Sequence, residues 1–283
     1  MPPAENHRAD TANGDARPIG VFDSGIGGLT VVSALRRALP RESIYYLGDT
    51  ARLPYGGKSA TTVQRYSLEI ASLLLGEDAK TIVVACNTAS ALALSALQEH
   101  LPVAVTGVIV PGAEAAIAAT RNGHIGVIGT RATIKSGAYE KAIRTLHPEV
   151  RVSARACPLL VPLIEEGRLT SEITDRVLME YLRPLLDEQI DTLVLGCTHY
   201  PLLRPAISRL LGDAVTLVDS AENCARAVGE LLKRTRLETL SQSGGSLTVA
   251  LTDPPDSFLD VAHDALQLEV GSVQLRNIGE LRG

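Results

Sequence analysis

Short apolar runs rich in β-branched residues alternate along this chain with amphipathic segments, and this alternation restricts the possible folds more than any other feature. The strand-like runs occupy residues 19–22, 43–49, 81–86, 124–130 and 191–197. The segments with helical periodicity occupy residues 29–39, 61–75, 89–101, 134–146, 172–186 and 204–211. Because the strand runs are apolar on both faces, they predict parallel sheets that helices cover on both sides. The expected fold class is α/β, doubly wound, with mainly parallel sheets.

Two pairs of similar motifs predict two α/β domains of similar size. "IGVFDSG" at residue 19 resembles "IGVIGTR" at 125, and "TIVVACNT" at 81 resembles "TLVLGCTH" at 192. Buried βα units also resemble one another without any duplication, and that alternative stays open. We expect residues 18–112 together with 219–283 to form the first domain and residues 113–218 the second. The active site is expected in the cleft between them.

The two ends of the chain differ in character from its middle. Residues 1–17 are polar and predict a disordered leader. Near the other end, "SQSGGS" at 241–246 predicts a flexible connection. It is followed by one further strand in "SLTVALTD" and one further helix in "FLDVAHDAL", which we expect to join the first domain.

Composition excludes several classes of partner. The net charge is −5 and the basic residues are scattered, so neither nucleic acid nor an anionic membrane is an expected partner. Aromatic residues make up 3% of the chain and Trp is absent, which disfavours base stacking. No apolar run approaches the ~18 residues that span a bilayer. The polar leader has no apolar segment of a secretory signal, so the expected location is the cytoplasm.

The four cysteines are the residues that point most directly to chemistry. Cys86 and Cys197 each stand where a buried strand ends, which is where open α/β sheets bind ligands. Backbone N–H groups there favour an anion, so we expect a thiol pKa lowered from ~8.5 toward neutrality. Cys157 and Cys224 lack such a setting, and we expect them to be small buried apolar residues.

Four uses of the paired thiols can be weighed from the residues alone. A disulfide would be a redox device in a cytoplasmic protein. Zinc is disfavoured, because Cys197 and His199 supply two ligands and no nearby pair completes the set. A nucleophilic Cys197 with His199 as its base would serve acyl transfer but would leave Cys86 without a role. In the fourth hypothesis, one thiolate removes a proton from a substrate carbon and the other thiol returns one to the opposite face. This hypothesis gives both thiols a role in catalysis.

Polar residues near the strand ends fit this last reading. Asp23 is placed to interact with Cys86 or with a substrate ammonium group, and His199 to interact with Cys197. Ser24 and the glycines of "DSGIGG" form a turn whose amides could hold a carboxylate. Neither "YGGKS" nor "SGIGG" completes a phosphate-binding or dinucleotide-binding fingerprint. A nucleotide cofactor is therefore not expected.

Four motifs in register give the chain a specific resemblance to a known family. "GVFDSGIGGLTV", "GDTARLPYG", "ACNTAS" and "GCTHYPLL" closely resemble the glutamate racemases, from about Pro18 through Leu211 and less sharply beyond. The resemblance implies interconversion of L- and D-glutamate without a cofactor or metal, supplying D-glutamate for bacterial peptidoglycan. It also implies two α/β domains with the site between them, and a homodimer.

The same resemblance implies roles for individual residues. Cys86 and Cys197 match the paired acid/base thiols, the first acting on D-glutamate and the second on L-glutamate. Asp23 and His199 match their assistants, and Glu165 of "VPLIEEG" resembles an acidic residue that supports the histidine. The residues that match substrate-binding positions are Asp23, Ser24, Pro54, Tyr55, Gly56, Asn87, Thr88, Thr130, Thr198 and His199. For Tyr55 a packed loop aromatic, and for Glu165 a solvated charge at a helix end, remain alternatives.

Three other functions stay open at this point. A racemase for aspartate or another acidic amino acid differs by as little as one methylene, which gives only modest discrimination. A Cys–His hydrolase or amidase would tolerate the loss of Cys86. An amino-acid binding protein with two closing lobes would bind its ligand without changing its optical rotation.

Overall fold

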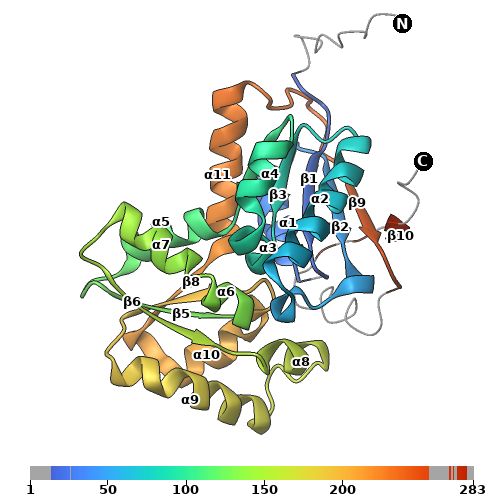
Figure 1. Cartoon of the computed structure of the whole chain (residues 1–283). Helices are drawn as coiled ribbons and strands as arrows, with labels where there is room; N and C mark the ends of the chain where they lie inside the picture. Colours follow the sequence, from blue (N-terminus) through green and yellow to red (C-terminus); the bar gives the residue numbers. More distant parts are fainter. Residues whose placement is uncertain (1–13, 26, 255–267, 269, 271–272, 279–283) are drawn as a thin grey trace, which may run out of the picture.

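The computed structural model describes residues 14–25, 27–254, 268, 270 and 273–278. The strands in this part form two sheets, and all pairings between them are parallel. Helices pack on both sheets (Figure 1). The expected α/β class with two parallel-sheet domains is therefore confirmed.

The first sheet has six strands in the order β10-β9-β2-β1-β3-β4. Their bounds are β1 Ile19–Asp23, β2 Ile44–Gly48, β3 Thr81–Val84, β4 Ala104–Gly107, β9 Leu247–Leu251 and β10 Val273–Leu275. The strand β1 lies in the middle and pairs with β2 and β3. Because β9 pairs with β2, the chain returns to the first sheet after it has completed the second.

The second sheet has four strands in the order β6-β5-β7-β8. Their bounds are β5 His124–Gly129, β6 Arg151–Ala156, β7 Thr192–Gly196 and β8 Thr216–Asp219. Every residue of the two central strands, β5 and β7, is buried. The strand β6 lies at the edge, and its exposed residues Arg151 and Arg155 suit a position where a charged strand discourages pairing with another chain.

The helices divide between the faces of the two sheets. Against the first sheet, α1 Leu29–Ala38 and α11 Ser220–Thr235 pack on one face and α2 Ala60–Gly76, α3 Asn87–Leu92 and α4 Leu94–His100 on the other. Against the second sheet, α5 Ile109–Ala119 and α7 Ala138–Leu146 pack on one face. The other face carries α8 Leu160–Glu165, α9 Glu172–Asp187 and α10 Arg204–Leu211 (Figure 1).

Two segments that the sequence predicts as single helices are each broken. The helix expected over residues 134–146 is α6 Arg131–Lys135 followed by α7, and Gly137 between them adopts a φ of 64°. That left-handed conformation ends α6 and suits glycine, which has no Cβ. The helix expected over 89–101 is α3 followed by α4, with the break at Ala93.

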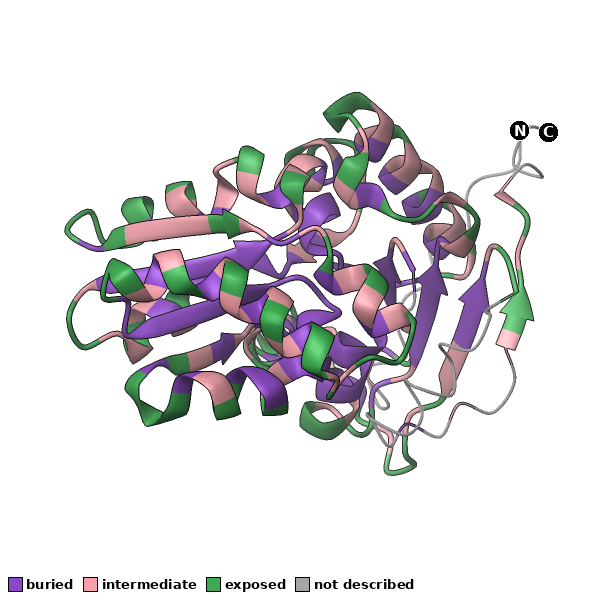
Figure 2. Cartoon of the chain, turned by 90° about the horizontal axis from the view of Figure 1, so that it is seen from below, coloured by how far each residue is buried: buried purple, intermediate pink, exposed green. Residues whose placement is uncertain are grey.

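The buried interior is formed mainly by the strands and by the helix faces that cover them. Figure 2 shows the central strands of both sheets buried, while the edge strands β6 and β10 and the outward faces of the helices are intermediate or exposed. One continuous cluster of buried apolar side chains includes Val21 and Leu35 of the first sheet region and Leu193 and Leu195 of the second. The two sheets therefore share part of their core. Among the described residues, no helix is long and apolar enough to cross a membrane.

The predicted domain boundaries fall within elements. The boundary between residues 112 and 113 lies inside α5, and the one between 218 and 219 lies inside β8. The strands of residues 19–107 and 247–275 share the first sheet, and those of 124–219 share the second. The boundaries themselves stay predictions.

The ends of the chain are partly described. Of the predicted leader, residues 1–13 lie outside the described residues, whereas residues 14–17 belong to the folded part: Asp15 is buried, and Gly14 forms a β-bridge with Thr239. The predicted strand after "SQSGGS" is β9. The helix predicted over "FLDVAHDAL", residues 258–266, lies outside the described residues.

Candidate active site

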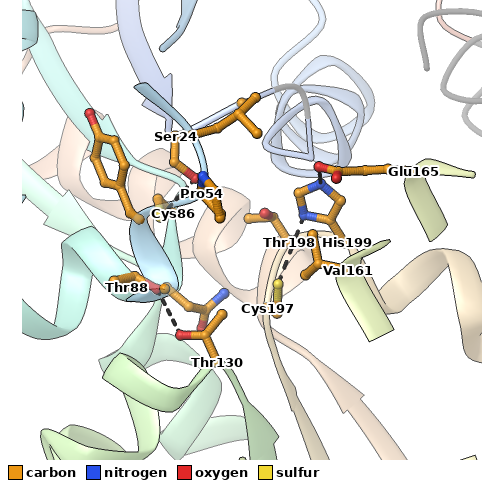
Figure 3. Close-up of a pocket in the computed structure, with 15 residues that line it drawn as sticks. Ser24, Pro54, Cys86, Thr88, Thr130, Val161, Glu165, Cys197, Thr198 and His199 are labelled. Atoms are coloured by element: carbon orange, nitrogen blue, oxygen red, sulfur yellow. Dashed lines mark hydrogen bonds and ion pairs between the residues drawn. The ribbon is translucent and has the colours of Figure 1, made fainter. Parts of the chain in front are cut away.

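A cavity of about 30 Å³ lies at the carboxyl ends of the strands, between the two sheets (Figure 3). Its lining comes from Ser24, Gly25, Leu53, Pro54, Tyr55, Gly56, Cys86, Asn87, Thr88, Thr130, Val161, Glu165, Cys197, Thr198 and His199. Every site residue predicted from the sequence, except Asp23, is in this lining. The place agrees with the general position of ligand sites in open α/β sheets.

Cys86 follows β3 and is the N-cap of α3. Its Sγ accepts a hydrogen bond from the Ala89 N–H at 3.5 Å, and its S–H donates to Ser24 Oγ at 3.6 Å. Burial raises the pKa of the Cys86 thiol well above its ordinary value, and the Asp23 carboxylate raises it further. The lowered pKa expected from the strand-end position is therefore wrong for Cys86, because burial raises the thiol pKa by more than the Ala89 N–H group lowers it.

Cys197 follows β7 and has a different partner. Its Sγ lies 3.8 Å from Nδ1 of His199, and Nε2 of His199 lies 3.4 Å from a Glu165 carboxylate oxygen. Burial lowers the pKa of His199, but its hydrogen bonds to Cys197 and Glu165 outweigh burial and raise the pKa to about 10. His199 is therefore an imidazolium at neutral pH, and its positive charge lies beside the Cys197 sulfur.

Asp23 lies at the end of β1, behind the cavity wall. One carboxylate oxygen accepts the Ser24 N–H at 2.8 Å, and the other accepts the hydroxyl of Thr198 at 3.1 Å. Thr198 belongs to the second sheet region, so this bond joins the two domains next to both cysteines. The structure thus places Asp23 in contact with two lining residues, and not in the lining itself.

The turn after Asp23 packs tightly against His199. A Cβ atom at Gly27 would lie 2.5 Å from Nδ1 of His199 and 2.7 Å from Oγ1 of Thr198. The Thr30 hydroxyl also lies 2.9 Å from the Gly27 carbonyl oxygen and 3.2 Å from that of Thr198. Glycine at position 27 is what lets the first domain approach the Cys197–His199 pair this closely.

Three threonine hydroxyls connect the domains on the other side of the cavity. Thr88 lies 2.9 Å from Thr130 and 3.2 Å from Thr133, and the last two lie 3.0 Å apart, measured between their Oγ1 atoms. Gly56 is packed against Thr130, since a Cβ at Gly56 would lie 2.8 Å from the Thr130 Cβ. This cluster brings the loop that carries Pro54, Tyr55 and Gly56 against the second domain.

Asp49 holds the loop of Pro54, Tyr55 and Gly56 in place through hydrogen bonds. It is buried at the end of β2 and accepts hydrogen bonds from Arg52 Nε at 2.7 Å, from Thr252 Oγ1 at 3.0 Å and from the Tyr55 hydroxyl. The Arg52 guanidinium also lies over the ring of Tyr66, 3.9 Å from its centroid. Tyr55 is therefore held by a buried polar network as well as by packing.

Asn87 contributes an amide directly after Cys86. Its Oδ1 accepts a hydrogen bond from the Tyr139 hydroxyl at 2.7 Å. Its Nδ2 is buried and has no hydrogen-bond partner among the described residues. A buried donor without a partner is unfavourable, so Nδ2 of Asn87 is available to a ligand in the cavity.

Cys157 and Cys224 lie in the apolar core, as predicted, and all four thiols are free. Within the described part of the chain, no group of three or more His, Cys, Asp or Glu side chains is arranged to hold a metal ion.

Sequence reasoning missed several residues of this site. Leu53 and Val161 line the cavity, and Asp49 and Tyr139 support lining residues through hydrogen bonds. A usable signal existed for Asp49, because "SIYYLGD" ends a strand at the same edge as Asp23 and Cys86. Tyr139 gives no such signal, since it lies inside a helix far along the chain from Asn87.

Comparisons with known proteins point to one family. The family model described as Asp/Glu/Hydantoin racemase matches residues 19–228. A glutamate racemase of Geobacter metallireducens is 52% identical over 257 residues, which cover 91% of this chain and 95% of that protein. A glutamate racemase isoform of Bacillus anthracis has a solved structure with a TM-score of 0.86 and 43% identity, covering 92% of this chain and 97% of that one.

A second solved structure resembles this chain equally well. Glutamate racemase of Francisella tularensis, in complex with D-glutamate, matches with a TM-score of 0.87 and 38% identity, covering 94% of this chain and 99% of that one. Aspartate racemase of Picrophilus torridus matches at 17% identity and a TM-score of 0.54, which shows a shared fold alone. The chain therefore belongs to the Asp/Glu/Hydantoin racemase family.

Proposed function

We propose that this protein interconverts L- and D-glutamate without a cofactor and supplies D-glutamate for peptidoglycan. The observation that carries the proposal is the pair of cysteines at the ends of β3 and β7, which reach one cavity from two different sheets. Relatives that are 52% and 47% identical over most of this chain carry the same activity in their names.

The proposed chemistry is a proton exchange at one carbon. The Cys197 thiolate takes the α-hydrogen of L-glutamate as a proton, and the electron pair of the C–H bond stays on the α-carbon. The Cys86 thiol then gives its proton to the opposite face, which forms D-glutamate. The enzyme is left with a thiol at Cys197 and a thiolate at Cys86, the state that acts on D-glutamate. Each step is general acid or base catalysis by a positioned group.

The neighbours of each sulfur support this assignment. The His199 imidazolium, held by Glu165, stabilises a thiolate at Cys197. Among the residues that the structure describes, no such cation lies beside Cys86, and burial favours its neutral thiol. A substrate ammonium group near Asp23 would bring the missing positive charge and favour the Cys86 thiolate. The substrate would thus complete the electrostatics of the site.

Polar groups around the cavity would hold the glutamate carboxylates. The proposed binding residues are Ser24, Pro54, Tyr55, Gly56, Asn87, Thr88, Thr130, Thr198 and His199. A cavity of about 30 Å³ has room for roughly two water molecules, which is less than glutamate requires. We therefore expect the two domains to separate as substrate enters, which would break the hydrogen bonds Thr198–Asp23 and Thr88–Thr130.

The test is racemisation by purified protein without added pyridoxal phosphate and with a metal chelator. We expect loss of the circular dichroism signal of L-glutamate, and a much slower change with L-aspartate. Cys86→Ala and Cys197→Ala should each abolish the change. Turnover of L-aspartate faster than L-glutamate, or full activity of either variant, would contradict the proposal.

We also propose that the protein acts in the cytoplasm as a homodimer, as the family resemblance implies. Light scattering coupled to size exclusion should give twice the chain mass of 30.0 kDa. A mass of one chain at micromolar concentration would contradict the dimer and leave the racemase proposal unaffected.

A further inference from the structure

Tyr139 occupies a slot between two glycines beside the active site. It is 3% exposed and lies in the first turn of α7, in the second domain. A Cβ at Gly196, the residue before Cys197, would lie 3.1 Å from the ring, and one at Gly112 of α5 would lie 3.4 Å from the ring and the hydroxyl. Because Gly196 and Gly112 have no side chains, the Tyr139 ring packs directly against the backbone of β7 and α5.

The Tyr139 hydroxyl crosses to the first domain. It donates a 2.7 Å hydrogen bond to Oδ1 of Asn87, the residue that follows Cys86. Burial raises the pKa of this phenol well above its usual value, so it stays protonated and remains a donor at neutral pH. The phenol gives its one hydrogen to Oδ1 and also pairs with the Ser220 side chain, so Nδ2 is the end of the Asn87 amide that this contact leaves unused.

The Nδ2 end of the Asn87 amide is the end that could bind a ligand. Nδ2 of Asn87 is buried and has no hydrogen-bond partner among the described residues. Asn87 lines the same cavity as Cys86 and Cys197. An amide that rotated by half a turn would present its oxygen to the substrate and repel a carboxylate. Fixing Oδ1 against Tyr139 leaves two N–H donors for a carboxylate oxygen, which is a charge-assisted and hence stronger type of hydrogen bond.

We propose that Tyr139 is a positioning residue that orients the Asn87 amide so that its Nδ2 donates to a carboxylate of the substrate. This rests on the proposed function for the identity of the substrate, glutamate. Tyr139 does not line the cavity, so it acts through Asn87. Because the two residues belong to different domains, the orientation is set when the domains close on the substrate.

The test is a double-mutant cycle with Tyr139→Phe and Asn87→Ala, read by calorimetric titration with glutamate and by KM and kcat. Tyr139→Phe should weaken glutamate binding and raise KM roughly tenfold, the effect of misplacing one hydrogen bond to a charged group, while kcat changes less. In the Asn87→Ala background the same change should have no further effect. Tyr45→Phe removes another buried hydroxyl, which lies outside the cavity lining, and should leave binding unchanged.

Two outcomes would overturn the inference. One is binding and KM of Tyr139→Phe within about twofold of wild type, less than the smallest usual contribution of a hydrogen bond. The other is an equal loss in both backgrounds, which would mean that Tyr139 acts only through packing. Because binding is measured apart from turnover, wild-type protein that binds glutamate without racemising it would contradict the proposed function and not the role of Tyr139.

Discussion

A buried ion pair at the end of the first sheet opposite the active site gives the sharpest prediction of stability. Lys80 precedes β3, is 1% exposed, and donates to the Glu42 carboxylate at 2.5 Å and to the Asp15 carbonyl oxygen at 2.6 Å. The other carboxylate oxygen of Glu42 accepts the Thr239 N–H at 2.8 Å. One lysine therefore joins the start of the folded chain to the segment that returns from α11.

Lys80→Met keeps most of the side-chain volume and removes the charge. It leaves the Glu42 carboxylate buried without its cation and the Asp15 carbonyl without its donor. Breaking a buried pair in this way costs about 3–5 kcal/mol. In a chain of this size 1 kcal/mol corresponds to about 2 °C, so we expect a thermal midpoint roughly 6–10 °C lower. Urea unfolding followed by circular dichroism gives the free energy directly.

Two controls separate this explanation from a general effect of losing a lysine. Lys233→Met removes an exposed lysine of α11 and should change the unfolding free energy by less than about 0.5 kcal/mol. Adding Glu42→Gln to Lys80→Met neutralises the stranded charge and should recover part of the loss. A loss below about 1 kcal/mol in Lys80→Met, the value of an exposed pair, would refute the reasoning.

Two further predictions concern the Cys197–His199 pair. Gly27→Ala should lower kcat/KM about 100-fold with a small change in thermal midpoint, because its Cβ would displace the His199 ring. In the control Gly76→Ala, the new Cβ meets no atom within 4 Å, so kcat/KM should not change. Equal activity of the two variants would contradict the prediction. The stability that protonated His199 contributes should be complete below about pH 6.5 and lost as pH rises through about 10, since folding raises its pKa. The unfolding free energies of wild type and His199→Gln should therefore converge over that range, and a constant gap would count against it.

The sequence predicts the interior strands well and the peripheral elements poorly. Strands β1, β3, β5 and β7 are apolar runs buried on both faces, so their composition alone identifies them. Strand β4, "AVTG", is too short to show a period, and β6, "RVSARA", carries two arginines because it lies at an edge. The breaks at Ala93 and Gly137 interrupt segments whose helical periodicity continues across them.

The features of the candidate site also divide into those that local sequence predicts and those that depend on the folded chain. Strand-end position and motif resemblance locate Cys86, Cys197, Asn87 and His199, because these depend on local sequence. The contacts Tyr139–Asn87 and Asp49–Thr252 join residues 52 and 203 positions apart, and only the folded chain reveals them. The raised pKa of Cys86 likewise depends on burial and on Asp23, which local sequence does not give.

The central claim is that two thiols act on opposite faces of one carbon, and hydrogen exchange in deuterated buffer tests it most directly. Cys86→Ala retains the Cys197 side, so it should exchange the α-hydrogen of L-glutamate for deuterium without forming D-glutamate. Cys197→Ala should do the reverse with D-glutamate. Proton NMR with chiral separation reads both results. Formation of the opposite enantiomer by either single variant would contradict the two-thiol mechanism.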